Sequence, residues 1–336
     1  MTDQKVTSST EPIGGRDVRK PRTVAQYFGV TMRGFCMGCA DVVPGVSGGT
    51  MAFILGIYEE LIDSIRSLAR PPFLRAISKF RIGEALGIVN WKFLVALGSG
   101  VLLAILSLAK AIEWAITNHP AYVWSFFFGL VLASVITVGK RILKWSPLLV
   151  SALLLGMVGA YVLVGLVPLQ TPNDWWFLFL SGALAICAMI LPGISGAFIL
   201  LLLGKYHYVL AAVNDRNPVP IFWVGLGCAV GIVSFAQVLG WLFRRYHDVT
   251  VAALTGLMLG SLRKVWPWKV DLAWVLDRHG ERMPTVQENV LPALTLNGTV
   301  NLQVLFAIGL AVAGFVTVLL LDRWAAEAEP ELRPGT

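Results

Sequence analysis

The chain has 336 residues, of which 56% are hydrophobic and only 14% are charged. Soluble domains carry about 25% charged residues, so this composition excludes a soluble globular protein and predicts an all-α polytopic membrane protein. The net charge of +7 is then a signal of membrane topology, and we expect no nucleic-acid partner.

The N-terminal part predicts an arm followed by an interrupted hairpin. Residues 1–23 are mostly polar and basic, as in a surface arm, and the next apolar segment, 24–40, stops before Pro44–Gly49. A second helix is expected at 48–66. Because a helix needs ~20 residues to cross the bilayer core, we expect this pair to enter the membrane and return on the same side.

The rest of the chain predicts further spans and a second hairpin. Residues 67–92 read as a basic connection. Spans are then expected at 93–113, 120–139, 147–168, 219–243, 249–265 and 302–321, with the second hairpin at 175–190 and 196–212. The expected units are the arm 1–23, a first repeat 24–140, a linking helix 141–174, a second repeat 175–265, an extracytoplasmic loop 266–300, a C-terminal helix 301–322 and a cytoplasmic tail 323–336.

An internal repeat relates the two hairpins. The run PGVSGG at Pro44–Gly49 recurs as PGISGA at Pro192–Ala197, an offset of 148 residues (192 − 44). Three crossings lie between corresponding points, so the second half is inverted relative to the first. Each half is predicted to be a re-entrant hairpin, broken at PG(V/I)SG, plus two transmembrane helices, an arrangement typical of transporters.

The placement of basic residues predicts the orientation. Lys and Arg gather in the N-terminal arm and in 66–92, 140–146 and 244–248, whereas the short loops 114–119 and 168–174 contain none. The positive-inside rule therefore places both termini in the cytoplasm, in a multi-pass protein of the cell membrane. Charge alone does not distinguish re-entrant from spanning hairpins.

The interrupted segments have the chemistry of an anion site. The first N–H groups of a helix have no intrahelical partner and, with the helix dipole, favour a negative group such as phosphate. Glycine allows close backbone approach, and serine and threonine add hydroxyl donors. The alternative is a pair of structural kinks. The candidate binding residues of the two breaks are Pro44, Gly45, Ser47, Gly48, Gly49, Thr50, Pro192, Gly193, Ser195 and Gly196.

Three charged residues near the breaks are further candidates. Asp41, whose repeat partner is Met189, is a candidate to carry a coupling proton or sodium ion or to pair with Arg33; the alternative is simple polarity at a helix end. Arg33 either meets a phosphate or extends to the cytoplasmic surface, and we favour the second. Lys205 is the strong cation of the second hairpin and a candidate to accompany an anion.

Other polar residues suggest no catalysis. Glu59 and Glu60 read as solvated helix ends, and His247 as an ordinary loop residue. Cys36, Cys39, Cys187 and Cys228 lie in apolar segments with no histidine cluster, so no metal or cofactor is expected.

The first break belongs to a longer signature. This signature resembles that of a bacterial and archaeal membrane family assigned as polyprenyl-phosphate transporters. Its residues here are Gly34-Phe35, Met37-Gly38, Ala40 through Thr50 and Gly56-Ile57-Tyr58-Glu59. Leu191–Gly196, Leu203-Gly204 with Tyr206, and Gly256-Leu257 with Gly260–Leu262 resemble the same family, and the likeness covers residues 24–322. It implies that the protein returns undecaprenyl phosphate from the outer to the cytoplasmic leaflet.

Two other classes of function use similar residues. A transporter or channel for a small anion would need the same site without an opening to lipid. An intramembrane lipid phosphatase would need a nucleophile with a base in reach, and none of the four histidines lies beside a conspicuous serine or aspartate motif. We therefore expect a transporter and not an enzyme, with polyprenyl phosphate and the bilayer as partners and an oligomeric state that the sequence does not fix.

Overall fold

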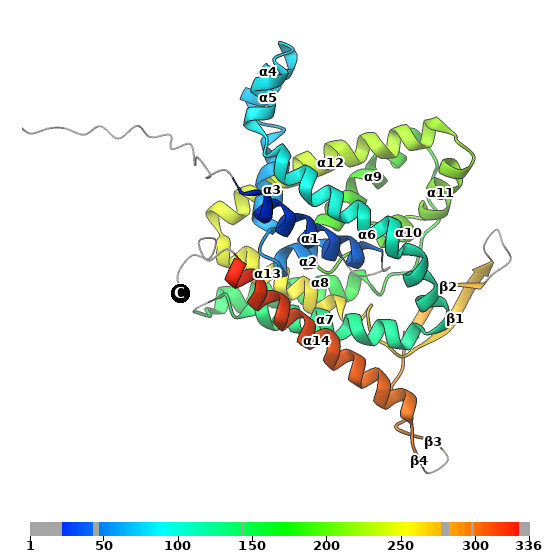
Figure 1. Ribbon diagram of the computed structural model, residues 1–336. Helices are drawn as coiled ribbons and strands as arrows, with labels where there is room; N and C mark the ends of the chain where they lie inside the picture. Colours follow the sequence, from blue (N-terminus) through cyan, green and yellow to red (C-terminus); the bar gives the residue numbers. More distant parts are fainter. Residues whose placement is uncertain (1–21, 43–46, 143, 277–281, 297–298, 329–336) are drawn as a thin grey trace, which may run out of the picture.

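The computed structural model describes residues 22–42, 47–142, 144–276, 282–296 and 299–328, and this part of the chain is mostly helical (Figure 1). The predicted Pro44 and Gly45 lie outside the described residues. The elements are α1 (Val24–Asp41), α2 (Gly48–Ile54), α3 (Tyr58–Ser67), α4 (Pro71–Ser78), α5 (Ile82–Ile88), α6 (Trp91–Asn118), α7 (Pro120–Gly139), α8 (Pro147–Leu163), α9 (Trp175–Ile190), α10 (Gly196–Leu202), α11 (Tyr206–Asn214), α12 (Pro218–Arg245), α13 (His247–Ser261), β1 (Lys269–Leu276), β2 (Arg282–Asn289), β3 (Thr295–Leu296), β4 (Thr299–Val300) and α14 (Leu302–Ala328).

Local sequence explains where several helices begin. Thr23 and Gln26 form a capping box at the start of α1, in which each side chain accepts a hydrogen bond from the other residue's N–H. Helices α7, α8 and α12 each carry proline in the first turn, where the missing N–H costs nothing. These signals are local and could be read from the sequence.

Four described helices are long and apolar enough to cross a membrane, namely α6, α7, α12 and α14, and the chain is a multi-pass membrane protein. The expected spans 147–168 and 249–265 were too long, because α8 has 17 residues and α13 has 15. Arg263 explains the end of α8: its guanidinium donates to the Tyr161 carbonyl at 3.0 Å and lies 4.4 Å from the Tyr161 ring. A cation at this position satisfies the last carbonyls of a helix.

The long helices pack in pairs: α1 against α6, α9 against α12, α8 against α13, and α7 against α14. The first two pairs use glycine alike. No Cβ would fit at Gly34 against the Leu97 carbonyl, nor at Gly182 against the Val224 carbonyl. These glycines are 148 residues apart (182 − 34), so both halves bring the first hairpin helix close to a long helix in the same way.

The helices that follow the two breaks are shorter than expected. In place of single helices at 48–66 and 196–212, the chain bends at Gly56 (φ +72°) and Gly204 (φ +65°). The bend between α10 and α11 is 106°. Glycine adopts this left-handed conformation without strain, and each bend separates a seven-residue helix from the next one.

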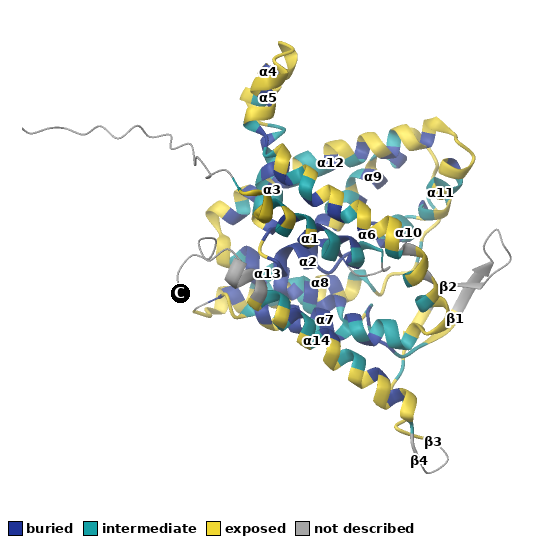
Figure 2. Cartoon of the chain, in the orientation of Figure 1, coloured by how far each residue is buried: buried dark blue, intermediate teal, exposed yellow. Residues whose placement is uncertain are grey.

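Burial distinguishes the centre of the molecule from its outer faces (Figure 2). Every residue of α2 is buried, whereas α6, α12 and α14 expose many large apolar side chains, as lipid-facing helices do. Helices α4 and α5 project from the body beside α3 (Figure 1).

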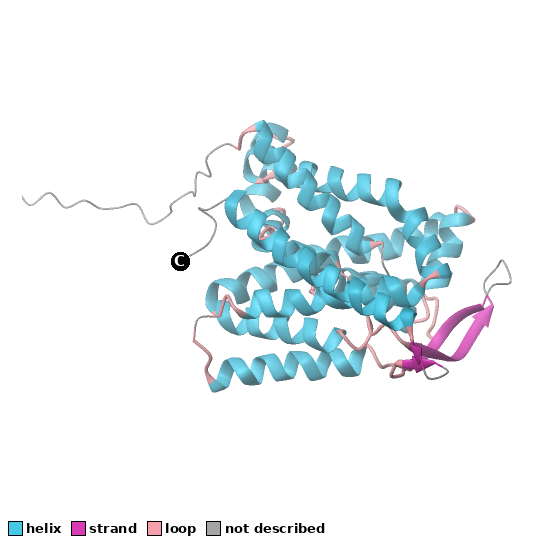
Figure 3. Cartoon of the chain, turned by 60° about the horizontal axis from the view of Figure 1, so that its bottom comes forward, coloured by secondary structure: helices cyan, strands magenta, loops and turns pink. Residues whose placement is uncertain are grey.

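The polar segment 266–300 contains strands that the all-α prediction did not include. Strands β1 and β2 form an antiparallel hairpin and β3 and β4 a short second pair, at one end of the helical body (Figure 3). The hairpin is held to its base because the Trp266 indole N–H donates to the Val290 carbonyl at 2.9 Å and the Val290 N–H donates to the Trp268 carbonyl at 3.0 Å.

Candidate functional site

The first break is capped from within the chain. Asp41, the last residue of α1, accepts a hydrogen bond from the Gly48 N–H through Oδ1 at 2.7 Å, and Ser47 Oγ accepts one from the Gly49 N–H at 3.1 Å. These two N–H groups have no intrahelical partner, as expected, and side chains that precede the helix accept their hydrogen bonds. The other Asp41 oxygen is buried and has no hydrogen-bond partner among the described residues.

The two breaks contact one another in the interior. The Ser47 hydroxyl lies 3.2 Å from both the Met189 and the Leu191 carbonyls, to which it donates. In return, the Gly193 N–H donates to Thr50 Oγ1 at 2.9 Å. Residues about 140 positions apart in the sequence therefore share buried polar groups.

The second break differs from the first. Ser195 precedes α10 but makes no side-chain cap hydrogen bond, and Met189 stands where the first copy has the capping aspartate. Gly193 has φ +88°, and a Cβ there would lie 2.8 Å from Ser261 Oγ of α13. Pro192 and Gly196 are buried beside it. This break is thus held by its packing on α13 and by its contact with Thr50.

The structure does not bring Lys205 to the breaks. Its ammonium donates to the Thr171 carbonyl at 2.7 Å and to Asn173 Oδ1 at 2.6 Å, and it lies 5.5 Å from the Phe177 ring. Phe177 is at the start of α9 and the break follows Ile190, so about 20 Å of helix separates them at ~1.5 Å per residue. Lys205 instead fixes the loop before α9.

Arg33 is buried within the protein and does not extend to the surface as we favoured. Only 3% of the residue is exposed. It lies in the part of α1 that packs against α6, eight residues (41 − 33) before Asp41. At ~3.6 residues per turn, the buried guanidinium of Arg33 lies a little over two turns of α1 before Asp41.

Glu60 is also less solvated than expected. The Arg22 guanidinium donates to both of its carboxylate oxygens, at 2.8 and 2.7 Å, and the Asn90 amide donates at 2.8 Å. The Glu60 side chain is only 9% exposed. These bonds fasten the start of α1 and the start of α6 to α3.

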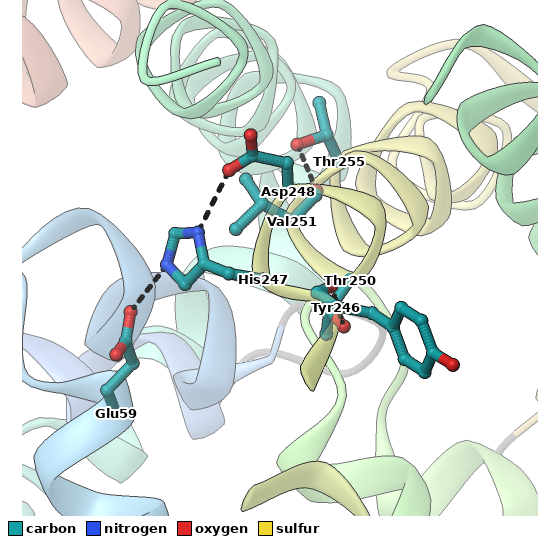
Figure 4. A network of polar contacts seen from close by, with 7 residues as sticks. All are labelled: Glu59, Tyr246, His247, Asp248, Thr250, Val251 and Thr255. Atoms are coloured by element: carbon teal, nitrogen blue, oxygen red, sulfur yellow. Dashed lines mark hydrogen bonds and ion pairs between the residues drawn. The ribbon is translucent and has the colours of Figure 1, made fainter. Parts of the chain in front are cut away.

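His247 at the start of α13 contacts Glu59 of α3, the residue before Glu60 (Figure 4). Its Nε2 lies 3.2 Å from Glu59 of α3 and its Nδ1 lies 3.1 Å from Asp248. The hydrogen bond that His247 donates to Glu59 is the largest cause that raises the pKa of His247 to about 9, and Asp248 adds to it. The interpretation of His247 as an ordinary loop residue is therefore wrong. No sequence pattern signals this contact, because Glu59 is 188 residues away.

Arg141 is a second contact that sequence reasoning missed. Its guanidinium donates to the Ile54 carbonyl at 3.2 Å, at the end of α2, and lies 3.6 Å from Asp322 of α14. In the sequence, Arg141 is one of several basic residues that follow α7, and that pattern indicates topology but not a partner.

Two cavities in the described part of the chain lie away from the breaks. A cavity of about 80 Å³ lies between α3 and α12, lined by Glu59, Asp63 and Arg244 among others, and one of about 530 Å³ lies between α7 and α14. No group of three or more His, Cys, Asp or Glu in the described part could hold a metal ion.

Together these features define the class: a multi-pass membrane protein in which two segments with the same PG(V/I)SG sequence pattern contact one another in the interior. The chain belongs to the VCA0040-like family, described as undecaprenyl phosphate translocase-like, which it matches over residues 37–283.

Two relatives carry the name polyprenyl-phosphate transporter. The protein of Vibrio cholerae serotype O1 is 43% identical over 301 residues, which cover 89% of this chain and 97% of the relative. The protein of Staphylococcus aureus is 28% identical over 255 residues, which cover 70% and 85%. No solved structure matches the chain.

Proposed function

We propose that this protein moves undecaprenyl or another polyprenyl phosphate from the outer to the cytoplasmic leaflet, so that the lipid carrier is used again in cell-envelope synthesis. The head group passes the two breaks while the prenyl tail stays in lipid. The protein acts as a transporter in the cell membrane, with both termini in the cytoplasm, and not as an enzyme. The names of the relatives support the lipid substrate.

The observation that carries this proposal is the direct contact of the two breaks through Ser47, Thr50 and Gly193. A bare phosphate is costly to place in hydrocarbon, and a path across the membrane must supply polar partners at its deepest point. Backbone N–H groups, hydroxyls and buried Arg33 are such partners. The breaks separate when the head group enters, and the groups that now bond to each other then bond to phosphate.

Asp41 has a particular role in this scheme. Its carboxylate occupies the position at the start of α2 that an incoming phosphate would take. Two negative groups repel each other, so phosphate binds there when Asp41 is neutralised by a proton or sodium ion or moves away. This exchange would couple transport of the lipid to the cation.

A transporter for a small anion is the second candidate, because the same polar groups would serve free phosphate. The lipid remains the first candidate, because the outer faces of α6, α12 and α14 expose apolar side chains. A prenyl tail could stay in the lipid along these faces while its head group moves. Uptake of radiolabelled phosphate or chloride in the absence of lipid substrate would favour the small anion.

The test is the amount of undecaprenyl phosphate on the outer leaflet of cells with and without this protein. Depletion should raise it, and Ser47→Ala, Arg33→Gln or Asp41→Asn should reproduce the rise at normal protein levels. Gly29→Ala in α1, where a Cβ meets nothing within 4 Å, is the matched control. Unchanged exposure in a strain with no other such transporter would refute the proposal.

A further inference from the structure

Two lysines lie side by side next to the β1–β2 hairpin. Lys264 follows α13 and Lys269 opens β1. The Lys269 ammonium donates to the backbone carbonyl of Lys264 at 2.5 Å, and both residues are half-buried. Neither lysine forms an ion pair with a carboxylate among the described residues.

Aromatic rings from two other helices cover these ammonium groups. Lys269 Nζ lies 4.2 Å from the centroid of the Trp124 ring on α7, and Lys264 Nζ lies 4.9 Å from that of Phe198 on α10. Cation–π contacts at these distances offset part of the lost hydration. The rings also give the site an apolar wall suited to a ligand with a charged head and a hydrocarbon tail.

The electrostatics of the pair favour an anion between the lysines. Burial is the largest cause that lowers the pKa of Lys269 to about 7; the charge of Lys264 lowers it further, while Asp271 opposes the shift. Asp271 is engaged elsewhere, since its Oδ1 accepts a hydrogen bond from Gln287 at 2.8 Å. Asp271 therefore compensates the two half-buried like charges only in part. Burying like charges is destabilising, and a bound phosphate would reduce that cost.

The pair is also adjacent to the second break. Phe198, under the Lys264 ammonium, lies three residues (198 − 195) after Ser195. Ser261, three residues (264 − 261) before Lys264, is the α13 residue against which Gly193 packs. An anion held at the lysines therefore needs only a short movement to reach the break.

We propose that Lys264 and Lys269 form an outer binding site for a phosphomonoester, which captures the lipid head group before it reaches the two breaks. The chemical class follows from the paired cations and the aromatic wall, and the assignment to a lipid rests on the proposed function.

The test is a calorimetric titration of the purified full-length protein in detergent with farnesyl phosphate, inorganic phosphate and farnesol. Lys264→Gln and Lys269→Gln should each weaken farnesyl phosphate binding about tenfold or more, the loss of one charge-assisted hydrogen bond. Lys264→Arg should retain most of the affinity. Lys110→Gln, which removes an exposed cation on α6, should have no effect.

The outcomes separate this inference from the proposed function. Farnesyl phosphate binding within twofold of wild type in the folded double variant would refute the site. Inorganic phosphate binding as tightly as farnesyl phosphate would overturn the assignment to a lipid head group. A wild-type protein that binds farnesyl phosphate at the lysines but moves no undecaprenyl phosphate in vesicles would refute the proposed function and leave the site standing.

Discussion

The two breaks share one sequence pattern, PG(V/I)SG, but are held by different contacts. The first carries its own negative charge, because Asp41 caps the Gly48 N–H and Ser47 caps the Gly49 N–H. The second has Met189 in place of the aspartate and an uncapped Ser195, and two lysines from outside the repeat motif lie close to it. The two breaks therefore share a sequence pattern and an interior contact, but the charged residues beside them differ.

The largest effect on stability and transport is expected at Gly49, where the second copy has an alanine that is larger by one methyl group. Ala197 of the second copy is exposed, whereas a Cβ at Gly49 would clash with the Ile190 carbonyl. Gly49→Ala should force the breaks apart, lower the free energy of unfolding by about 1–3 kcal/mol and impair transport. Thermal unfolding in detergent, with Gly29→Ala as the control, measures this. Equal stability of the two variants would contradict the contact.

The second-largest effect on stability is expected at Asp41, whose carboxylate accepts the hydrogen bond from the Gly48 N–H. Asp41→Ala should lower the free energy of unfolding by about 0.5–2 kcal/mol, the usual cost of losing an N-terminal cap. Asp41→Asn keeps an oxygen for the Gly48 N–H and should cost less, yet it removes the charge that we assign to coupling. Transport by the Asn variant should thus fall more than its stability does. If the Asp41→Asn variant transports lipid at the wild-type rate and still responds to a proton or sodium gradient, Asp41 has no role in coupling.

The two serines test the asymmetry most directly. Ser47→Ala removes the cap of Gly49 and the contact with α9 and should cost about 1 kcal/mol of stability. Ser195→Ala removes no cap and should leave the unfolding temperature within error of wild type. If Ser195→Ala loses transport while its unfolding temperature is unchanged, the loss indicates that the Ser195 hydroxyl contacts the substrate. Equal destabilisation of both variants would show that the breaks are capped alike.

The smallest expected effect is the pH dependence of the Glu59–His247 contact. The pKa of His247 is raised to about 9 from 6.5, so the stabilisation is fully present below pH 6.5 and is lost as the pH rises through about 9. The contact is partly exposed and contributes less than about 1 kcal/mol. Thermal unfolding between pH 6 and 10 should show a smaller decrease in Glu59→Gln than in wild type; identical decreases would contradict it.

The sequence predicted those features that depend on local pattern. The repeat at Pro44–Gly49 and Pro192–Ala197, the long apolar helices α6, α7, α12 and α14, and the short helices before each break follow from hydropathy and from proline and glycine. The bends at Gly56 and Gly204 had a signal, since both glycines occupy matching positions, but glycine alone does not distinguish a bend from helix packing.

The missed features depend on tertiary contacts. His247 as the partner of Glu59, and the rings of Phe198 and Trp124 over Lys264 and Lys269, are each decided by which elements meet in space. Asp41 as the cap of α2 depends in the same way on how the end of α1 meets the start of α2. The early end of α8 has the same origin, because Arg263 that caps it is 102 residues from Tyr161 in the sequence. Hydropathy carries no information about such pairs.

The most direct test of the central claim is the movement of labelled undecaprenyl phosphate across vesicles that contain the purified protein. The account predicts that the wild-type protein transfers lipid between leaflets faster than empty vesicles do, and that Gly49→Ala slows the transfer while Gly29→Ala does not. Transfer no faster than in empty vesicles, by a folded protein supplied with proton and sodium gradients, would contradict it.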